Sequence, residues 1–252
     1  AAKNYNDVTV ISSTEQYPEL IDELTVNKGY TSLKFREKMS RLAFTETAFY
    51  DSTISNYFNE ITDTQFPKKK IIHANLVERL RYGENAHQES ALYSQKDNLD
   101  LIKLHGKTLS YNNYNDIFSA LSITKSFPKN VGTVIIKHAN PCGVSILKDK
   151  LRSYKSALAC DPLSAFGGVI SCNFKVSKSL ALELNKIFFE VIIGNGFEKN
   201  AVKILKTKKN LRLIDASKFS LDKNLKFNSI NASVLIQSED NKIFQKKNFR
   251  VV

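Results

Sequence analysis

The 252 residues of this chain suffice for one large or two modest domains with a buried core. Hydrophobic residues make up 42% of the chain and charged residues 25%, as in ordinary globular proteins. Apolar runs stay short of membrane-spanning length, and the first residues lack an apolar signal core. We therefore expect a cytoplasmic protein without a membrane partner.

The net charge of +12 raises nucleic-acid binding as a possible function. However, the basic residues are mostly lysines and are scattered, and short runs such as Lys68–Lys70 lack interleaved aromatic residues. A solvated, lysine-rich surface is the favoured interpretation, with an RNA-binding module as the alternative. The same positive field would attract an anionic small molecule.

Helices dominate the predictions for the first quarter of the chain. Ile61–Asn75 is polar, contains Pro67 and shows little periodicity, so we place a linker at residues 66–75, between domains at residues 1–65 and 76–252. The elements predicted before the linker are a short strand at Val8–Ser12, a helix at Tyr17–Thr25, and more than one helix within Ser32–Asn59.

Beyond the linker, short apolar runs alternate with helical patterns, which predicts an α/β fold. The predicted strands are Ala91–Tyr93, Leu101–Leu104, Val131–Ile136, Gly168–Cys172, Phe189–Ile193 and Leu211–Ile214. The predicted helices are Ile117–Phe127, Leu151–Cys160, Ser179–Lys186 and Glu198–Lys206.

The strand Val131–Ile136 ends abruptly in Lys137 and His138, and we predict a loop built on Asn140, Pro141 and Gly143 after it. In open α/β sheets, ligands bind beyond the carboxyl ends of the strands. An imidazole beside an ammonium at such a place is a candidate acid–base pair. The alternative is a strand that ends in solvent with ordinary surface charges.

Three further segments carry ligand-binding side chains. Leu80–Gln88 is a polar loop, Ser110–Asp116 is an amide-rich loop before a helix, and Asp161–Ile170 contains a Gly-Gly pair. An arginine can hold a phosphate, a tyrosine or histidine can stack and form hydrogen bonds, and paired glycines allow close backbone approach. Together they indicate a site for an anionic, heteroaromatic ligand.

The stretches LRYGENAHQ, KTLSYNNYND, IKHANPCGV and DPLSAFGGVI, in this order and spacing, resemble one enzyme family. Its members are bifunctional purine-biosynthesis enzymes that combine AICAR transformylase (phosphoribosylaminoimidazolecarboxamide formyltransferase) with IMP cyclohydrolase. The resemblance runs over essentially the whole chain. It implies that residues 1–65 are the mostly helical C-terminal end of a methylglyoxal-synthase-like cyclohydrolase domain. Residues 76–252 would be the N-terminal half of a cytidine-deaminase-like transformylase domain, and we expect an internal fragment.

The resemblance also implies a reaction. The transformylase moves a formyl group from the co-substrate 10-formyltetrahydrofolate to the 5-amino group of AICAR, and the full-length protein then closes formyl-AICAR to IMP. His138 would take the amine proton, with Lys137 beside it holding the folate or the developing charge. Lys3 resembles a cyclohydrolase active-site lysine whose partners lie outside this chain.

Substrate-binding roles follow from the same motifs. Arg81 is expected toward the AICAR phosphate, Tyr82 near its base or ribose, and Asn113 near its carboxamide, with His87 assisting. Asn140 would fix the catalytic loop, and Gly167 and Gly168 would shape the pocket. Asn112 and Asp116 are expected to shape the turn and cap the following helix.

The resemblance implies a homodimer for the full-length protein and little activity for this chain alone. It implies no metal, although His138 and Cys142 resemble part of the zinc pattern of nucleobase deaminases. Those sites need a glutamate two positions after the histidine and a Cys-x-x-Cys pair, whereas this chain has Asn140 and Ser145. A zinc-dependent deaminase and an inactive remnant stay as alternatives.

Overall fold

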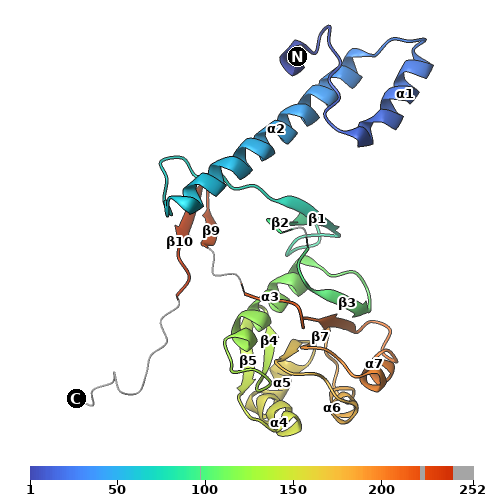
Figure 1. Ribbon diagram of the computed structural model, residues 1–252. Helices are drawn as coiled ribbons and strands as arrows, with labels where there is room; N and C mark the ends of the chain where they lie inside the picture. The colour runs from blue at the N-terminus through green and yellow to red at the C-terminus, as the bar shows by residue number, and fades with distance from the viewer. Residues whose placement is uncertain (97, 222–224, 241–252) are drawn as a thin grey trace. The chain divides into compact units, whose positions relative to one another are not determined.

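The computed structural model describes residues 1–96, 98–221 and 225–240. The chain divides into two compact units, Ala1–Asn75 and Leu76–Val252 (Figure 1). Within the described residues, no helix combines the length and the apolar character that crossing a membrane requires.

The first unit is helical. It contains the short 3-10 helices η1 (Ala2–Asn4) and η2 (Thr14–Gln16), and the α-helices α1 (Tyr17–Val26) and α2 (Leu33–Ile61). Helix α2 is one continuous helix, so the prediction of more than one helix within Ser32–Asn59 is wrong. Its 29 residues include neither Gly nor Pro, and the Ser32 side chain caps its first turn by accepting from the Phe35 N–H.

The N-terminal segment is held along α2 by polar side chains of the helix. Arg36 donates to the carbonyls of Tyr5 and Asn6 at 2.8 and 2.7 Å, and the Ser40 hydroxyl donates to the Ala2 carbonyl at 2.6 Å. The strand predicted at Val8–Ser12 does not form. A strand needs a neighbour to pair its backbone groups, and this segment has none within the described part of the unit.

The second unit is built on a mixed six-stranded sheet of order β3-β8-β7-β6-β4-β5 (Figure 1). The strands are β3 (Ile102–His105), β4 (Thr133–Lys137), β5 (Asn140–Ser145), β6 (Val169–Cys172), β7 (Val191–Gly194) and β8 (Arg212–Asp215). Strands β6, β7 and β8 are parallel, whereas β4 is antiparallel to both β5 and β6, and β3 is antiparallel to β8. The α/β prediction is confirmed at this level.

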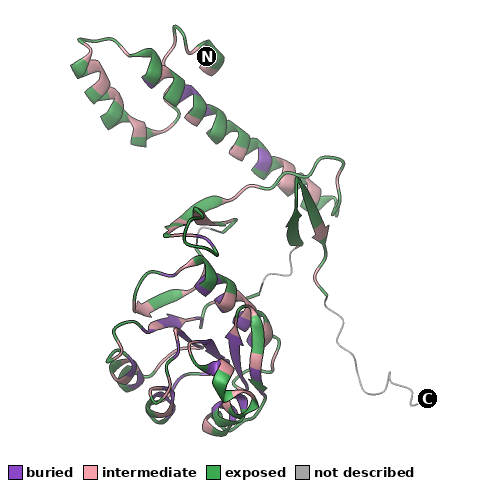
Figure 2. Ribbon diagram, turned by 180° about the vertical axis from the view of Figure 1, so that it is seen from behind, coloured by how far each residue is buried: buried purple, intermediate pink, exposed green. Residues whose placement is uncertain are grey.

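Helices cover both faces of this sheet. They are α3 (Tyr111–Lys125), α4 (Lys150–Cys160), the short α5 (Pro162–Ala165), α6 (Lys178–Leu184) and α7 (Lys199–Leu205). Helix α3 packs with Val134 and Ile136, while α4, α6 and α7 pack with Ile135 on the opposite face. Because side chains alternate along a strand, β4 is buried on both faces, as Figure 2 shows for the central strands.

Two small sheets complete the unit. Strand β1 (Asn75–Leu80) pairs with β2 (Ser90–Ser94), and β9 (Lys226–Ile230) pairs with β10 (Ser233–Gln237). Of these four strands, the sequence patterns predicted only β2. The other three are largely exposed and therefore carry little apolar alternation.

The antiparallel placement of β4 corrects the expected position of the site. Ile136 near the end of β4 pairs with Val169 at the start of β6. The carboxyl end of β4 therefore lies beside the amino ends of the parallel strands, and not at their carboxyl ends as the crevice rule suggested. The prediction of a loop on Asn140, Pro141 and Gly143 is also wrong, because Asn140–Ser145 forms strand β5. Only His138 and Ala139 connect β4 to β5.

Candidate active site

Lys137 and His138 lie at a tight hairpin turn between β4 and β5. Lys137 pairs with Asn140, which leaves His138 and Ala139 as the two turn residues, with φ angles of +52° and +60°. Two successive positive φ values are typical of the type I′ hairpin turn, which usually contains Asn and Gly. Each residue with a side chain in this conformation costs about 1–2 kcal/mol. The turn is therefore strained, and other groups must hold it.

Two side chains bind the turn. The Ala139 N–H donates to Oδ1 of Asp116, on α3, at 2.6 Å, and the Asn140 amide donates to the His138 carbonyl at 2.8 Å. Burial raises the pKa of Asp116, and the hydrogen bond from Ala139 opposes this rise. The His138 side chain is exposed beyond the end of the sheet.

Lys137 connects the turn to the segment that precedes β6. Its ammonium donates to the Phe166 carbonyl at 2.9 Å. Gly167 follows with a φ of +75°, and a Cβ on Gly168 would lie 2.8 Å from the Ile136 carbonyl. The Gly-Gly pair therefore serves a left-handed bend and a close approach to β4.

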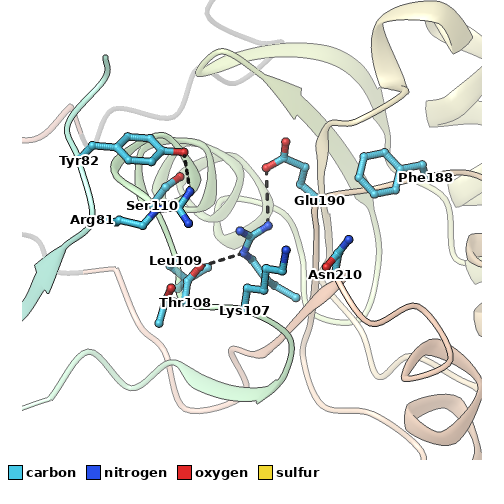
Figure 3. Close-up of a pocket in the computed structure, with 10 residues that line it drawn as sticks. Arg81, Tyr82, Lys107, Thr108, Leu109, Ser110, Phe188, Glu190 and Asn210 are labelled. Carbon is cyan, nitrogen blue, oxygen red and sulfur yellow. Dashed lines mark hydrogen bonds and ion pairs between the residues drawn. The ribbon is translucent and has the colours of Figure 1, made fainter. Parts of the chain in front are cut away.

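A polar pocket of about 410 Å³ lies at the same edge of the sheet (Figure 3). It holds the cations of Arg81, Lys107 and Arg212 and the carboxylate of Glu190. The other lining residues are Tyr82, Thr108, Leu109, Ser110, Phe188 and Asn210. An excess of cations with aromatic and hydroxyl groups suits an anionic ligand that also forms hydrogen bonds.

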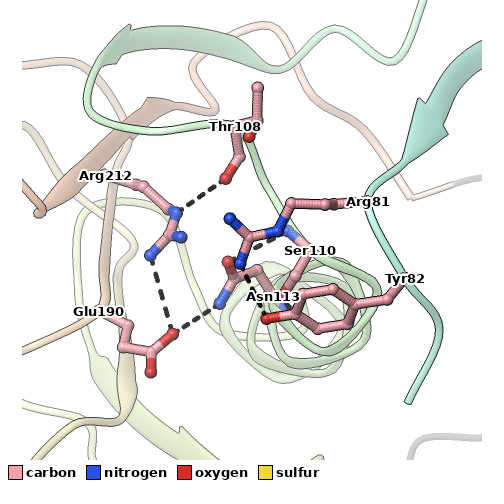
Figure 4. Close-up of polar contacts among 7 residues, drawn as sticks. All are labelled: Arg81, Tyr82, Thr108, Ser110, Asn113, Glu190 and Arg212. Atoms are coloured by element: carbon pink, nitrogen blue, oxygen red, sulfur yellow. Dashed lines mark hydrogen bonds and ion pairs between the residues drawn. The ribbon is translucent and has the colours of Figure 1, made fainter. Parts of the chain in front are cut away.

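A hydrogen-bonded network fixes the inner wall of this pocket (Figure 4). The Asn113 amide donates to Oε2 of Glu190 at 2.8 Å, and Arg212 forms an ion pair with the same oxygen at 3.8 Å. Arg212 Nε also donates to the Thr108 carbonyl at 3.2 Å. Asn113 itself is buried in the first turn of α3, where it completes a capping box with Ser110.

The predicted loop Ser110–Asp116 is therefore helical from Tyr111 onward, since the capping box starts α3 earlier than the apolar pattern indicated. Asp116 and Asn112 do not cap this helix. Asp116 binds Ala139, and the Asn112 amide donates to the Glu84 carbonyl at 3.3 Å.

The Arg81–Tyr82 pair forms the opposite wall. The Arg81 guanidinium lies 5.0 Å from the centre of the Tyr82 ring and donates to the Tyr82 hydroxyl at 3.3 Å. Figure 4 shows both side chains directed toward Asn113 and Ser110. A guanidinium held in this way keeps donors available for a phosphate while the ring offers a stacking face.

Backbone contacts join the pocket to the hairpin turn. The Gly167 N–H donates to the Phe188 carbonyl at 2.9 Å, and the Glu190 N–H donates to the Gly168 carbonyl at 3.0 Å. The charges of His138 and Glu190 act on Asp116 in opposite directions, His138 lowering the pKa of its carboxyl and Glu190 raising it. The turn and the pocket therefore belong to one edge of the sheet, connected through the segment Phe166–Gly168.

The remaining predicted site residues lie elsewhere. His87 is exposed on the loop between β1 and β2, where the Gly83 N–H donates to the Gln88 carbonyl at 2.7 Å. Lys3 is exposed in η1 of the first unit. Within the part of the chain that the structure describes, no cluster of three or more His, Cys, Asp or Glu side chains could hold a metal ion.

The pocket residues that the sequence patterns did not single out include Lys107, Glu190, Asn210 and Arg212. Two of them left a signal. Glu190 and Arg212 are charged residues inside runs that otherwise predict buried strands. A charge at such a position needs a partner or an opening to solvent, so each of them marks a polar site.

Fold and site together define an α/β protein with a cationic pocket beside a strained hairpin turn. The family model of the AICARFT/IMPCHase bienzyme matches residues 1–252, and the chain belongs to this family. The family resemblance carried by the four motifs is thus confirmed.

Relatives support the same assignment. The bifunctional purine biosynthesis protein PurH of Bradyrhizobium diazoefficiens is 40% identical over 260 residues, which cover all of this chain and 49% of that protein. PurH of Persephonella marina is 40% identical over 258 residues, covering 98% of this chain and 49% of that protein. PurH of Listeria monocytogenes serotype 4b is 37% identical over 257 residues, covering all of this chain and 50% of that protein. The chain spans about half the length of the curated relatives that it matches.

Proposed function

We propose that this chain carries the AICAR-binding half of a transformylase site that acts in de novo IMP biosynthesis. The observation that carries the proposal is the single sheet edge that joins the Arg81–Tyr82 pocket to the Lys137–His138 turn. The printed name of the relatives, bifunctional purine biosynthesis protein, agrees with this role.

The reaction transfers a formyl group from 10-formyltetrahydrofolate to AICAR. The 5-amino nitrogen of AICAR bonds to the formyl carbon, and the bond from that carbon to N10 of the folate breaks. One proton leaves the amine and one proton reaches the departing nitrogen, so the reaction is balanced. The chain must therefore bind a nucleotide monophosphate, accept a proton and stabilise a developing oxyanion.

The pocket supplies the binding groups. Arg81 and Arg212 offer planar forks for the phosphate, with Lys107 as a further cation. Tyr82 provides a face for the heterocycle. Asn113 is assigned to the AICAR carboxamide, and its hydrogen bond to Glu190, which lines the pocket, supports this assignment.

The hairpin turn supplies the proton acceptor. His138 projects beyond the end of the sheet, and an imidazole is the side chain that most often serves as a general base. Lys137 is directed to the Phe166 carbonyl and provides the cation that faces the folate or the oxyanion. Asn140, Gly167 and Gly168 hold the shape of this edge, and His87 assists from the neighbouring loop.

The wider assignment has several parts. Residues 1–65 are the C-terminal end of a methylglyoxal-synthase-like cyclohydrolase domain, residues 66–75 are a linker, and residues 76–252 are the N-terminal half of a cytidine-deaminase-like transformylase domain. Lys3 acts in closure of formyl-AICAR to IMP within the complete protein, which is a cytoplasmic homodimer. The division into units at residue 75 supports this partition.

The test is AICAR formylation, followed through tetrahydrofolate release, in the complete gene product and in its His138→Ala variant. We expect the variant to lose activity by a factor of about 10²–10⁴, the usual contribution of a general base. AICAR affinity should change little in calorimetry, because the phosphate contacts remain.

Two outcomes would sink the proposal. Formyl transfer untouched by His138→Ala would remove the histidine from the mechanism. A complete gene product that neither formylates nor binds AICAR would leave an inactive remnant. A matched control is His105→Ala, since His105 lies on β3 and contacts the Lys208 carbonyl at 3.3 Å, outside the pocket.

A further inference from the structure

Asp116 makes an interaction that neither helix capping nor ligand binding explains. It lies in α3, 23 residues before Ala139, and its carboxylate accepts the Ala139 N–H at 2.6 Å. Its neighbours along the helix, Asn113 and Ile117, are buried against the sheet, so α3 is a firm support. The carboxylate thus ties the β4–β5 turn to the rigid body of the fold.

The turn needs such a tie. Type I′ turns usually contain Asn and Gly, whose backbones adopt positive φ readily, whereas this turn contains His138 and Ala139. A backbone in this conformation persists only where surrounding groups hold it, and such positions concentrate at functional sites. Here the surrounding groups are Asp116 on the Ala139 N–H and Asn140 on the His138 carbonyl.

The position of the turn determines the position of the imidazole. The His138 side chain is exposed, so its backbone, and not packing around the ring, sets where it starts. Misplacement by about 1 Å costs roughly 10²-fold in rate when a group must meet its substrate in one geometry. A contact that fixes the turn would therefore act on the rate and leave the nucleotide pocket unchanged.

We propose that Asp116 is a positioning residue that holds His138 in its reactive place through the Ala139 N–H. This inference rests on the proposed formyl transfer. Asp116 touches neither ligand in this role and transfers no proton. It faces the charges of His138 and Glu190, but its function is to hold the turn by accepting the Ala139 N–H.

Steady-state kinetics of the complete gene product test the proposal. Asp116→Ala should lower kcat by about 10- to 100-fold, with the KM for AICAR within about threefold of wild type. Asp116→Asn keeps an oxygen acceptor, so its kcat should stay within about fivefold. Adding Ala139→Gly to Asp116→Ala should recover kcat by about fivefold or more, because glycine adopts positive φ without the Cβ penalty.

Asp149 provides the matched control. Its carboxylate also accepts a backbone N–H, that of Arg152 at 2.7 Å, at the start of α4. Asp149→Ala should lower the melting temperature as a lost helix cap does, yet leave kcat unchanged. Should Asp116→Ala fail to fold, Asp116→Ser carries the same comparison with a polar side chain in its place.

Some results would overturn the proposal. These are a kcat within about threefold of wild type in Asp116→Ala and Asp116→Ser, a loss confined to KM, or no recovery on adding Ala139→Gly. If the wild-type protein lacks formyl transfer, the proposed function fails. The hydrogen bond from Ala139 to Asp116 is then tested by the hydrogen-exchange rate of the Ala139 amide. Exchange should be about tenfold faster in Asp116→Ala and unchanged in Asp149→Ala. Equal exchange in all three proteins would refute the tie itself.

Discussion

The two edges of the parallel strands β6, β7 and β8 differ in what they do with polar groups. At the amino edge, Gly168, Glu190 and Arg212 border an open pocket and the Lys137–His138 turn. At the carboxyl edge, the polar groups bind one another. The Lys125 ammonium donates to the Ala216 carbonyl at 3.0 Å and to Asn195 Oδ1 at 3.4 Å.

This difference shows why the common position for a ligand is closed here. Lys125 lies at the carboxyl edge, where burial lowers the pKa of its ammonium. The Asn173 amide nearby donates to the Pro128 carbonyl at 3.0 Å. The antiparallel hairpin β4–β5 brings its turn to the amino edge instead. The rule that ligands bind at carboxyl ends concerns parallel strands, and the reversed strand β4 places Lys137 and His138 at the other edge.

The largest expected effect separates the two edges by affinity. Arg212→Met and Arg81→Ala should each weaken AICAR binding by about 10- to 100-fold, since a hydrogen bond to a charged group contributes roughly 1.5–3 kcal/mol. Lys125→Met, at the carboxyl edge, should leave the affinity unchanged. Isothermal calorimetry measures all three. An equal loss in Lys125→Met would abolish the distinction between the edges.

A smaller effect concerns the charge of Glu190. Glu190→Gln keeps an acceptor for Asn113 but removes the negative charge that Arg212 faces at 3.8 Å. AICAR should bind about three- to fivefold more tightly at low salt, and the gain should shrink as ionic strength rises. Weaker binding instead would show that the Glu190 carboxylate contacts the nucleotide directly.

The smallest effect is a pH dependence at the carboxyl edge. The pKa of Lys125 is lowered in the folded protein from its ordinary 10.5, so the unfolded chain binds more protons between the two values. Titration of Lys125 therefore increases the free energy of unfolding as pH rises from its folded-state pKa to 10.5. The Lys125→Met variant should lack this increase in the free energy of unfolding. The increase should amount to less than about 1 kcal/mol, because the ammonium is only partly buried. Urea unfolding at about pH 8 and about pH 10 gives the difference between the two proteins.

Hydrophobic periodicity predicted many of the strands and helices. The runs at Val131–Ile136 and Gly168–Cys172 were predicted as strands, and β4 and β6 are there. Ser32–Asn59 was divided although nothing in it breaks a helix, and α2 runs through it. The sequence patterns did not predict strands β1, β5, β9 and β10, because exposed or Pro- and Gly-containing segments lack apolar alternation.

The sequence motifs identified some of the residues of the candidate site. Arg81, Tyr82 and Asn113 were named from the sequence; the structure has Arg81 and Tyr82 in the lining of one pocket, and Asn113 binds Glu190 of the same lining. Their roles toward AICAR stay predictions. Glu190 and Arg212 were passed over because a run of apolar residues around each suggested only a buried strand. Their function depends on which ends of which strands meet, and this is not a property of any single run.

The sequence by itself determined the family, the alternation of strands and helices, and the motif residues for which we propose a role in the chemistry. These follow from local patterns and from motifs that stand in one order along the chain. Only the tertiary structure decided the direction of β4, the edge at which the site lies, and the tie from Asp116 to Ala139. The reason is physical, because strand direction and contacts between distant residues result from packing and hydrogen bonding across the sheet.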